Sequence, residues 1–379
     1  MKSRIQSVDA LRGLIMIVMA LDHVRDFFHS AASQFQPDDL TRTTTALFFT
    51  RWITHFCAPV FFFTAGIGAF FWLRGDRTRA QLSAFLWKRG LWLVLLELTV
   101  LRLAMNFSVL EGPLLLSILW ALGWSMVALG FLVHVPVRAL AILSVAGIAL
   151  HNLADKIPAA RFGNWAWLWN VLHQQGAFTA GSITVVAAYP LVPWMFVMSA
   201  GFCFGRIIAM DAIERRRWLL RIGAALTVAF LLIRAINIYG DPRPWTNGIL
   251  SFLRVTKYPP SLDFLLMTIG PAILLLACFN RVTFSRANPL VVFGRVPLFY
   301  FLGHLFLAHA LMIPFALVRH GRAGFLFGPL RGDQYPADYG YDLWVVYAVW
   351  IAVVVMLYPL CLWFARVKER RHDWWLSYL

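Results

Sequence analysis

Residues 7–29 read SVDALRGLIMIVMALDHVRDFFH, an apolar run with charged residues near both of its ends. The run matches the roughly 20 residues that a helix needs to cross the hydrocarbon core of a membrane. A cleaved signal peptide is excluded, because the run contains Arg12, Asp22 and His23 and no small-residue cleavage site follows it. We therefore predict that this stretch is the first membrane-spanning helix.

The apolar character extends over the whole chain of 379 residues, of which 60% are hydrophobic and 14% are charged. Average soluble domains contain about 45–50% apolar and about 25% charged residues. Together with a mean hydropathy of +0.69, this composition excludes an ordinary soluble enzyme and a disordered chain. The apolar runs are continuous and do not alternate with a period of two, which excludes a β-barrel.

We predict an all-α, polytopic membrane protein, because every helix that crosses a membrane satisfies its own backbone hydrogen bonds. A single transmembrane domain is expected to cover residues 1–379. It should contain about ten transmembrane helices, at residues 9–29, 46–73, 90–108, 113–133, 138–153, 182–207, 218–239, 261–280, 289–318 and 342–366.

The basic residues predict the orientation of these helices. The formal net charge is +16, and the loops on the side of the two termini carry most of the Lys and Arg residues. Such loops face the cytoplasm, so both termini are expected there, and the long loops near 30–45, 154–181 and 240–260 are expected outside. The positive charge suits anionic membrane lipids, and we expect no nucleic-acid partner.

Charged groups and histidines within the spans are the main functional candidates, because they are costly at bilayer depth. Arg12 and His23 are eleven residues apart, which is about 16 Å and close to three turns, so both face one side of the first helix. In the ninth span, Arg295 is followed nine residues later by His304, which repeats this layout. Two such helices are suited to line one cavity. In the alternative interpretation, Arg12 reaches the inner headgroups, His23 bonds a neighbouring helix and Asp22 belongs to a solvated cap.

The second and third predicted spans also contain ionisable residues. Arg51 and His55 are spaced four residues apart, so they share one face of a helix, and a structural role for His55 is as compatible with the pattern as a functional one. Glu97 and Arg102 are expected to form structural ion pairs with other helices.

The predicted outer mouth of the protein has its own candidates. Lys257 and Tyr258 lie in VTKYPPSLDF, directly before a span that Ser261 is placed to cap. In the long loop near 154–181, Trp165 and Trp167 alternate with other residues; they are suited to stack on a sugar ring or to form an interfacial aromatic belt. The spacing of cysteines and histidines makes no zinc site, and we expect no metal.

Three stretches resemble a known family. SVDALRGLIMIVMALDHVRDFFH is similar to the opening of the bacterial membrane proteins related to heparan-α-glucosaminide N-acetyltransferase. TKYPPSLDFLLMTIG at residues 256–270 and YPLVPWMFVMSAGFCFG at residues 189–205 resemble further stretches of that group. The spacing of Arg12 and His23 also resembles the first-helix motif of the related acyltransferase-3 membrane enzymes.

The resemblance implies an acyltransferase of the bacterial inner membrane. It would move an acyl group, usually acetyl, from cytoplasmic acyl-CoA to an extracytoplasmic acceptor such as a glycan or sugar. His23 would be the catalytic base, and Asp22 and His304 are further catalytic candidates. Asp22 is adjacent to His23 in sequence but points about 100° away on a helix. A group from another span, such as His304, Tyr258 or Arg51, is therefore better suited to orient His23. In the lysosomal enzyme the residue aligned with His23 is asparagine and the catalytic histidine lies nearest His29, so the choice between His23 and His29 stays open.

The remaining candidates take their roles from this scheme. The phosphates of CoA would bind arginine at the cytoplasmic mouth, and an acetyl-histidine intermediate is the competing route. A secondary transporter or flippase with a proton relay of His, Asp and Arg is the alternative function, and a non-catalytic envelope scaffold is a third. Homo-oligomer formation is left open. The expected CoA ligands are Arg12 and Arg295, and the expected substrate-binding residues are Arg51, His55, Lys257, Tyr258, Trp165 and Trp167.

Overall fold

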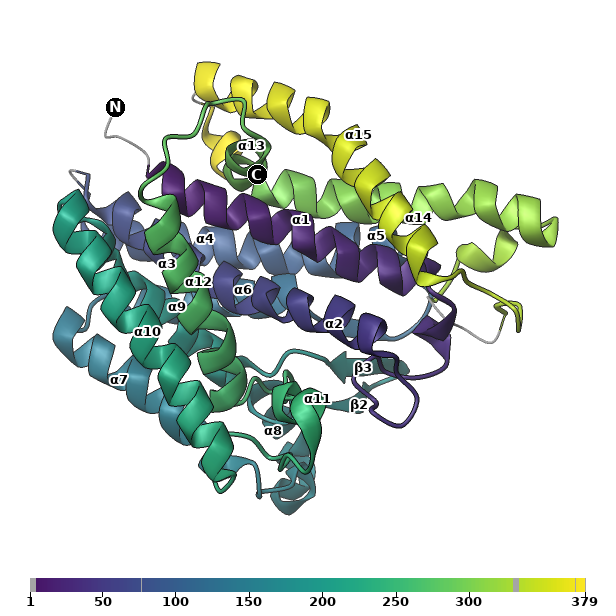
Figure 1. The fold of residues 1–379 in the computed structure, drawn as a ribbon, viewed down its shortest axis with the longest axis horizontal. Coiled ribbons are helices and arrows are strands. Elements are labelled where there is room, and N and C mark those ends of the chain that lie inside the picture. The colour runs from purple at the N-terminus through teal and green to yellow at the C-terminus, as the bar shows by residue number, and fades with distance from the viewer. Residues whose placement is uncertain (1–4, 76, 330–333, 372, 379) are drawn as a thin grey trace. The chain divides into compact units, whose positions relative to one another are not determined.

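The computed structural model describes residues 5–75, 77–329, 334–371 and 373–378 (Figure 1). Helices make up 72% of the described residues, and the chain divides into two compact units. Unit 1 comprises Met1–Cys57, Thr99–Gly112 and Val282–Leu379, and unit 2 comprises Ala58–Leu98 and Pro113–Arg281.

Unit 1 is built around its first helix, α1, which packs against α13, α14 and α15 (Figure 1). The elements of unit 1 are α1 (Gln6–Phe28), η1 (Ser30–Ser33), α2 (Thr45–Ile53), η2 (Thr54–Phe56), α5 (Arg102–Asn106), α13 (Pro289–Arg295), α14 (Pro297–His320), η6 (Gly324–Leu326), α15 (Leu343–Arg370) and η7 (Trp374–Ser377).

Two glycines bring the start of α1 against α13. A Cβ atom on Gly13 would collide with the Leu290 carbonyl, and one on Gly294 would collide with the Asp9 carbonyl. Small residues at such crossings let two helix backbones approach closely inside a membrane. Gly13 meets the start of α13 and Asp9 meets its end, so α13 runs antiparallel to the start of α1. The ring contacts of His23 with His304 and of Phe28 with Phe315 show that the following α14 runs in the same direction as α1.

Unit 2 contains the remaining long helices and a small sheet. Its elements are α3 (Cys57–Leu73), α4 (Arg79–Leu96), the π-helical turn η3 (Glu97–Leu101), β1 (Leu114–Leu116), α6 (Ile118–Leu132), α7 (Val137–Leu150), η4 (His151–Ala154), η5 (Ala159–Trp165), α8 (Ala166–Leu172), β2 (Gly176–Ala180), β3 (Ile183–Ala187), α9 (Leu191–Ile208), α10 (Ala212–Ile236), α11 (Gly248–Leu253) and α12 (Leu262–Phe279).

The sheet has the strand order β1-β3-β2, in which β1 and β3 are parallel and β2 and β3 are antiparallel. Leu115 pairs with Val186, and Phe178 pairs with Val185. The all-α prediction did not foresee these strands. Residues 183–187 read ITVVA, and such β-branched side chains favour a strand over a helix, so the predicted span at 182–207 becomes helical only at Leu191.

Local capping fixes several helix starts in the way that the residue types favour. The Ser261 hydroxyl accepts a hydrogen bond of 3.1 Å from the Phe264 amide at the start of α12, as predicted. Thr78 and Gln81 form a reciprocal capping box at the start of α4. The Asp211 carboxylate accepts from two backbone amides at the start of α10, which holds the pKa of this acid below its usual value.

Seven helices among the described residues are long and apolar enough to cross a membrane. Helices also occur at the other predicted positions. Of these, α1 and α4 carry more charge, and α6 is shorter. The predicted span at 289–318 is wrong in one respect, because it is two helices that meet at Val296. The seven are Thr45–Leu73, Val137–Ala154, Leu191–Ile208, Ala212–Ile236, Leu262–Phe279, Pro297–His320 and Leu343–Arg370.

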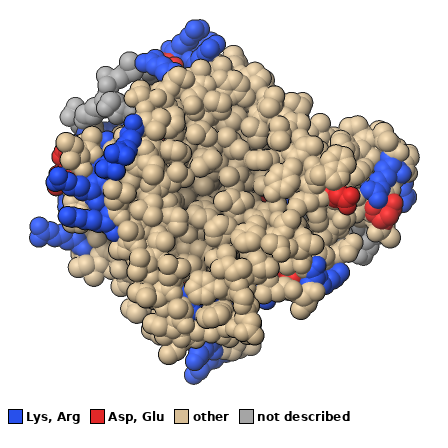
Figure 2. All heavy atoms as spheres, viewed as in Figure 1, with Lys and Arg blue, Asp and Glu red and all other residues tan. Residues whose placement is uncertain are grey.

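Basic side chains gather at one end of α10. Figure 2 shows them over the end where this helix begins. The first turns of α10 contain Arg215, Arg216, Arg217 and Arg221. Basic residues at a helix end beside an apolar band are the pattern expected of a helix that crosses a membrane.

Candidate functional site

A pair of histidines lies at the centre of unit 1. His23 of α1 and His304 of α14 have ring centroids 5.2 Å apart, with an angle of 40° between the rings. His304 has no exposed surface, whereas His23 is partly exposed. Phe301 packs its ring edge-on against both imidazoles. The structure therefore brings together two of the predicted residues from helices that are almost 300 positions apart in the chain.

The surroundings of His304 fix which of its nitrogens carries hydrogen. Its Nδ1 lies 3.0 Å from the carbonyl oxygen of Tyr300, and a carbonyl only accepts hydrogen bonds, so Nδ1 is the donor. In the neutral ring, Nε2 then has the free lone pair. This Nε2 atom is buried and has no hydrogen-bond partner. His304 thus presents a basic nitrogen inside the unit, behind the partly exposed His23.

Asp22, which directly precedes His23, is held by two arginines. Its carboxylate lies 2.8 Å from Arg51 and 2.9 Å from Arg25, and Arg25 also pairs with Asp26 at 2.9 Å. These charges are largely buried and compensate one another, which is the condition under which charges are tolerated away from water. The Asp22 carboxylate therefore ties α1 to α2, and its catalytic role stays a prediction.

The second helix returns along α1 and places His55 in the interior. Arg51 lies beside Asp22, and the Cys57 thiol lies 3.7 Å from the carbonyl of Ile15, also on α1. His55 lies between these two contacts, within η2, and is only 6% exposed. Of the predicted substrate-binding residues, Arg51 and His55 thus belong to the same unit as the histidine pair, beside the middle of α1.

His29 has a structural task in the backbone. It follows the end of α1, and its Nδ1 accepts a hydrogen bond of 3.1 Å from the amide of Ala31 at the start of η1. Burial lowers the pKa of His29, as does the nearby Arg25, while Asp342 raises it. Because the Nδ1 lone pair is already used, the neutral ring donates through Nε2 and is poorly placed to act as a base.

Arg12 and Arg295 lie at the same end of unit 1, because they flank the crossing of α1 and α13. The Arg12 guanidinium lies 4.0 Å from the carboxylate of Asp9. Arg295 forms an ion pair with Glu369 of α15, while its Nε is buried without a hydrogen-bond partner. The predicted layout, with arginine near one end and histidine further along each helix, is present in both helices.

The predicted residues of the outer mouth belong to unit 2. The Lys257 ammonium lies 5.1 Å from the ring centroid of Tyr258, whose hydroxyl donates to that of Tyr189 at 3.2 Å. Trp165 and Trp167 are 64% and 43% exposed, and their rings are 6.4 Å apart. Such exposed indoles are available to stack on a ligand or to lie among lipid headgroups.

Sequence reasoning misjudged the buried acid Glu97. Instead of pairing with a basic residue, its carboxylate accepts hydrogen bonds from the Ser117 hydroxyl and from three backbone amides, those of Ser117, Leu119 and Trp120, at 2.6–3.2 Å. These amides form the start of α6, where the helix dipole favours a negative charge. The expected ion pair is wrong because the backbone itself supplies the compensating positive charge.

Two further polar residues hold loops by bonding backbone carbonyls. Arg234, 2% exposed, donates to the carbonyls of Arg243, Ser251, Phe252 and Arg254 at 2.8–3.2 Å. His309, in unit 1, lies 3.0 Å from two backbone carbonyls and stacks between two aromatic rings. Their carbonyl partners belong to the short helices α5, η6 and α11 and to the loop residues beside α11, and no sequence pattern places these segments next to Arg234 or His309.

The comparisons with known proteins agree with the resemblance of the sequence. The profile of the family described as heparan-alpha-glucosaminide N-acetyltransferase, catalytic, matches residues 4–240, which is more than half of the chain. No curated protein matches the chain closely enough to count as a relative. The matched residues include His23 and His55 but not His304. On this match, and with seven helices able to cross a membrane, the chain belongs to the catalytic family of heparan-alpha-glucosaminide N-acetyltransferase and is an integral membrane protein of the acetyltransferase type.

Proposed function

We propose that the protein transfers an acyl group, specifically acetyl, from acyl-CoA to a hydroxyl or amine of an extracytoplasmic sugar or glycan. The observation that carries the proposal is the contact between His23 and His304, 5.2 Å from ring to ring. It supplies an imidazole that a substrate can reach and, behind it, a second imidazole with a buried basic nitrogen.

The chemical step uses the pair as a general base. His23 takes the proton from the acceptor hydroxyl or amine while the acceptor oxygen or nitrogen bonds to the acyl carbon. The carbon–sulfur bond of the thioester then breaks, and the leaving CoA thiolate receives the proton. In the reacting complex His23 would turn to donate a hydrogen bond to the Nε2 atom of His304, which would orient the His23 ring as the third member of a catalytic triad orients a histidine.

The arginine end of unit 1 is the proposed site for the donor. Arg12 precedes His23 by eleven residues, about 16 Å along a helix, and Arg295 lies beside the start of the same helix. Guanidinium groups bind phosphate oxygens through paired hydrogen bonds, so the two arginines suit the phosphates of CoA. The slender pantetheine arm would then lie along α1 and carry the thioester toward the histidines.

A polar pocket at the opposite end of α1 is the proposed acceptor site. It has a volume of ≈ 310 Å³, and its lining includes Ser30, Arg319, Tyr339 and Tyr341. The Tyr341 amide donates to the carbonyl of Phe28, the last residue of α1. Aromatic rings beside hydroxyl and charged groups suit a sugar ring, which has both apolar faces and hydroxyl groups. We place this end outside the cell and the arginine end, with both termini, in the cytoplasm of a bacterial inner membrane.

The experiment uses the purified full chain in lipid nanodiscs, supplied with acetyl-CoA and with glucosamine or its oligosaccharides. We expect acetylated product by mass spectrometry together with an equal amount of free CoA. Arg12→Gln should raise the KM for acetyl-CoA more than it lowers kcat, and His134→Gln, a change of an exposed histidine in unit 2, should leave both unchanged. Sugar movement across vesicles without consumption of acetyl-CoA would contradict the proposal and would indicate a transporter.

A further inference from the structure

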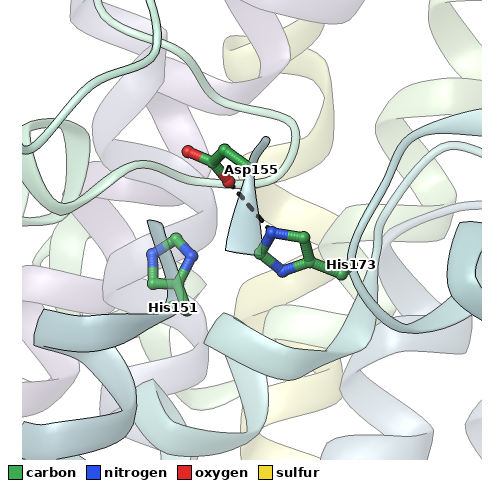
Figure 3. A group of neighbouring side chains, drawn as sticks. All are labelled: His151, Asp155 and His173. Carbon is green, nitrogen blue, oxygen red and sulfur yellow. Dashed lines mark hydrogen bonds and ion pairs between the residues drawn. The ribbon is translucent and has the colours of Figure 1, made fainter. Parts of the chain in front are cut away.

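A second group of polar side chains lies in unit 2, and none of them takes part in the proposed reaction (Figure 3). His151 begins η4 at the end of α7, Asp155 follows η4, and His173 follows α8. The short 3-10 turn η4 keeps His151 and Asp155 near each other, and α8 brings His173 to them. One ligand atom from each residue lies within 4.8 Å of the other two.

Two of the three side chains are already joined. The Nε2 atom of His173 lies 2.9 Å from one Asp155 oxygen, and the other oxygen accepts from the Asn152 amide at 2.7 Å. The oxygen of Asn152 in turn accepts from the Leu262 amide at 2.9 Å, at the start of α12. The carboxylate is therefore held in place by groups around it, which is the supporting arrangement found around metal ligands.

The third side chain, His151, packs against the ring of His173, with 5.8 Å between the ring centroids. It is only 7% exposed, and both of its ring nitrogens are buried without a hydrogen bond of normal geometry, although the Pro260 backbone lies near the ring. A buried polar group that is left unsatisfied costs about 1–3 kcal/mol. Figure 3 shows one of these nitrogens on the side of the ring that faces His173. The unsatisfied imidazole thus points to a ligand in the space that the three residues share.

We propose that His151, Asp155 and His173 bind one Zn²⁺ ion. Two imidazole nitrogens and one carboxylate oxygen are a usual set of three protein ligands for zinc, with a fourth position left for water. Bonds of about 2.0–2.2 Å in a tetrahedral site hold ligand atoms about 3.3–3.5 Å apart. The bonded pair at 2.9 Å would open slightly and His151 would move inward, which small side-chain rotations permit.

The charge and accessibility of the group agree with a cation. Two neutral imidazoles and one carboxylate carry a charge of −1, so the loaded site would have a charge of +1. His173 is 3% exposed, whereas the Asp155 side chain is 15% exposed and leaves a route for the ion. The bound ion would join the end of α7 to the end of α8, and thus fix the segment of unit 2 that contains Trp165 and Trp167. This role does not depend on acyl transfer.

The test uses the purified full chain in detergent, freed of metal with a chelator and titrated with Zn²⁺ alone. We expect one Zn²⁺ per chain by elemental analysis and calorimetry, and a visible Co²⁺ spectrum of tetrahedral type when Co²⁺ replaces Zn²⁺. His151→Ala and His173→Ala should each weaken Zn²⁺ affinity at least about 100-fold, because even supporting residues of a metal site account for about 10–100-fold. His134→Ala, which removes an exposed histidine of the same unit, should bind like the wild type.

Thermal unfolding keeps the test decisive if an alanine variant folds poorly. Zn²⁺ should raise the Tm of the wild type, since a ligand that binds only the folded state stabilises it, and should not raise the Tm of the conservative variants His151→Gln and Asp155→Asn. The proposal is overturned if the folded wild type takes up no stoichiometric Zn²⁺, or if the double variant of His151 and His173 binds Zn²⁺ as the wild type does.

Discussion

The two units both bury histidines, but they surround them with different partners. In unit 1, His304 donates to a backbone carbonyl and keeps a buried basic nitrogen beside His23. In unit 2, His173 is bonded to the carboxylate of Asp155, beside an unsatisfied His151. A neutral imidazole pair is suited to accept a proton, whereas imidazoles beside a fixed carboxylate are suited to hold a cation. The difference lies in the partner atom rather than in the residue type.

The units also differ in how they compensate buried acids. In unit 1, Asp22 forms ion pairs with Arg25 and Arg51. In unit 2, Glu97 is satisfied by backbone amides at the start of a helix. A carboxylate that caps a helix serves the fold, so we assign the acids and bases of unit 2 to structure and the histidine pair of unit 1 to chemistry.

The largest effect is expected from breaking the histidine pair of unit 1. His23→Ala should lower the rate of acyl transfer by about 10²–10⁴-fold, the usual contribution of a general base, which corresponds to about 2.7–5.4 kcal/mol of activation free energy. His304→Ala should act through the same step, so the double variant should be no slower than the slower single variant. Multiplied losses in this double-mutant cycle would show that the two rings act independently.

The next effect concerns the capping acid of unit 2. Glu97→Ala removes the acceptor of four hydrogen bonds, and bonds to a charged group contribute about 1.5–3 kcal/mol each. We expect the free energy of unfolding to fall by at least about 3 kcal/mol, measured by denaturant titration in micelles. Glu111→Ala, at an exposed acid, is the matched control. A loss for Glu97→Ala no larger than that of the control would contradict a structural role.

A smaller effect should show that a substitution in unit 1 leaves unit 2 unchanged. Gly13→Ala places a methyl group against the Leu290 carbonyl, and overpacking of this kind costs about 1–3 kcal/mol. The Tm and the transferase rate should fall, while the Zn²⁺ affinity of unit 2 should stay the same. Gly324→Ala has open space around it and should change none of these quantities. Equal loss of Zn²⁺ binding in Gly13→Ala would show that the two units do not respond separately.

The smallest effect is the pH dependence contributed by His29. Its pKa in the folded protein is lowered, mainly by burial, so the folded state favours the neutral ring. The stability that this contributes is present above the unfolded-state pKa of about 6.5 and is lost as the pH falls below it. The Tm should therefore fall more between pH 7 and pH 5 in the wild type than in His29→Asn, which keeps a capping side chain that does not titrate. Identical pH profiles would contradict this assignment.

Much of the helical fold could be predicted from apolar run length, and so could the layout of arginine and histidine along α1 and α14. The helical period places Arg12 and His23 on one face, and the repeat of that spacing near His304 suggested a shared location. The length of an apolar run did not predict where each helix inside it begins and ends. The strand at 183–187 follows β-branched residues, and the helix break at Val296 directly precedes Pro297. Both features lie inside apolar runs whose length alone predicts one continuous span.

The zinc candidate could not be predicted, because its ligands are separated by loops. His151 and His173 are 22 positions apart, and nothing in the residues between them reveals that α8 turns back toward η4. The partners of Glu97 were equally hidden, since backbone amides leave no trace in a sequence. Side-chain charge can be counted in the chain, but the direction of backbone dipoles appears only in the folded structure.

The central claim is that His23, rather than His29, is the base for acyl transfer. The most direct test is the steady-state rate of CoA release from acetyl-CoA, in the presence of acceptor, by His23→Ala and His29→Asn in the same nanodisc preparation. The structure predicts a loss of at least about 100-fold for His23→Ala and a rate close to that of the wild type for His29→Asn. A folded His23→Ala protein with the wild-type rate, or a loss confined to His29→Asn, would contradict it.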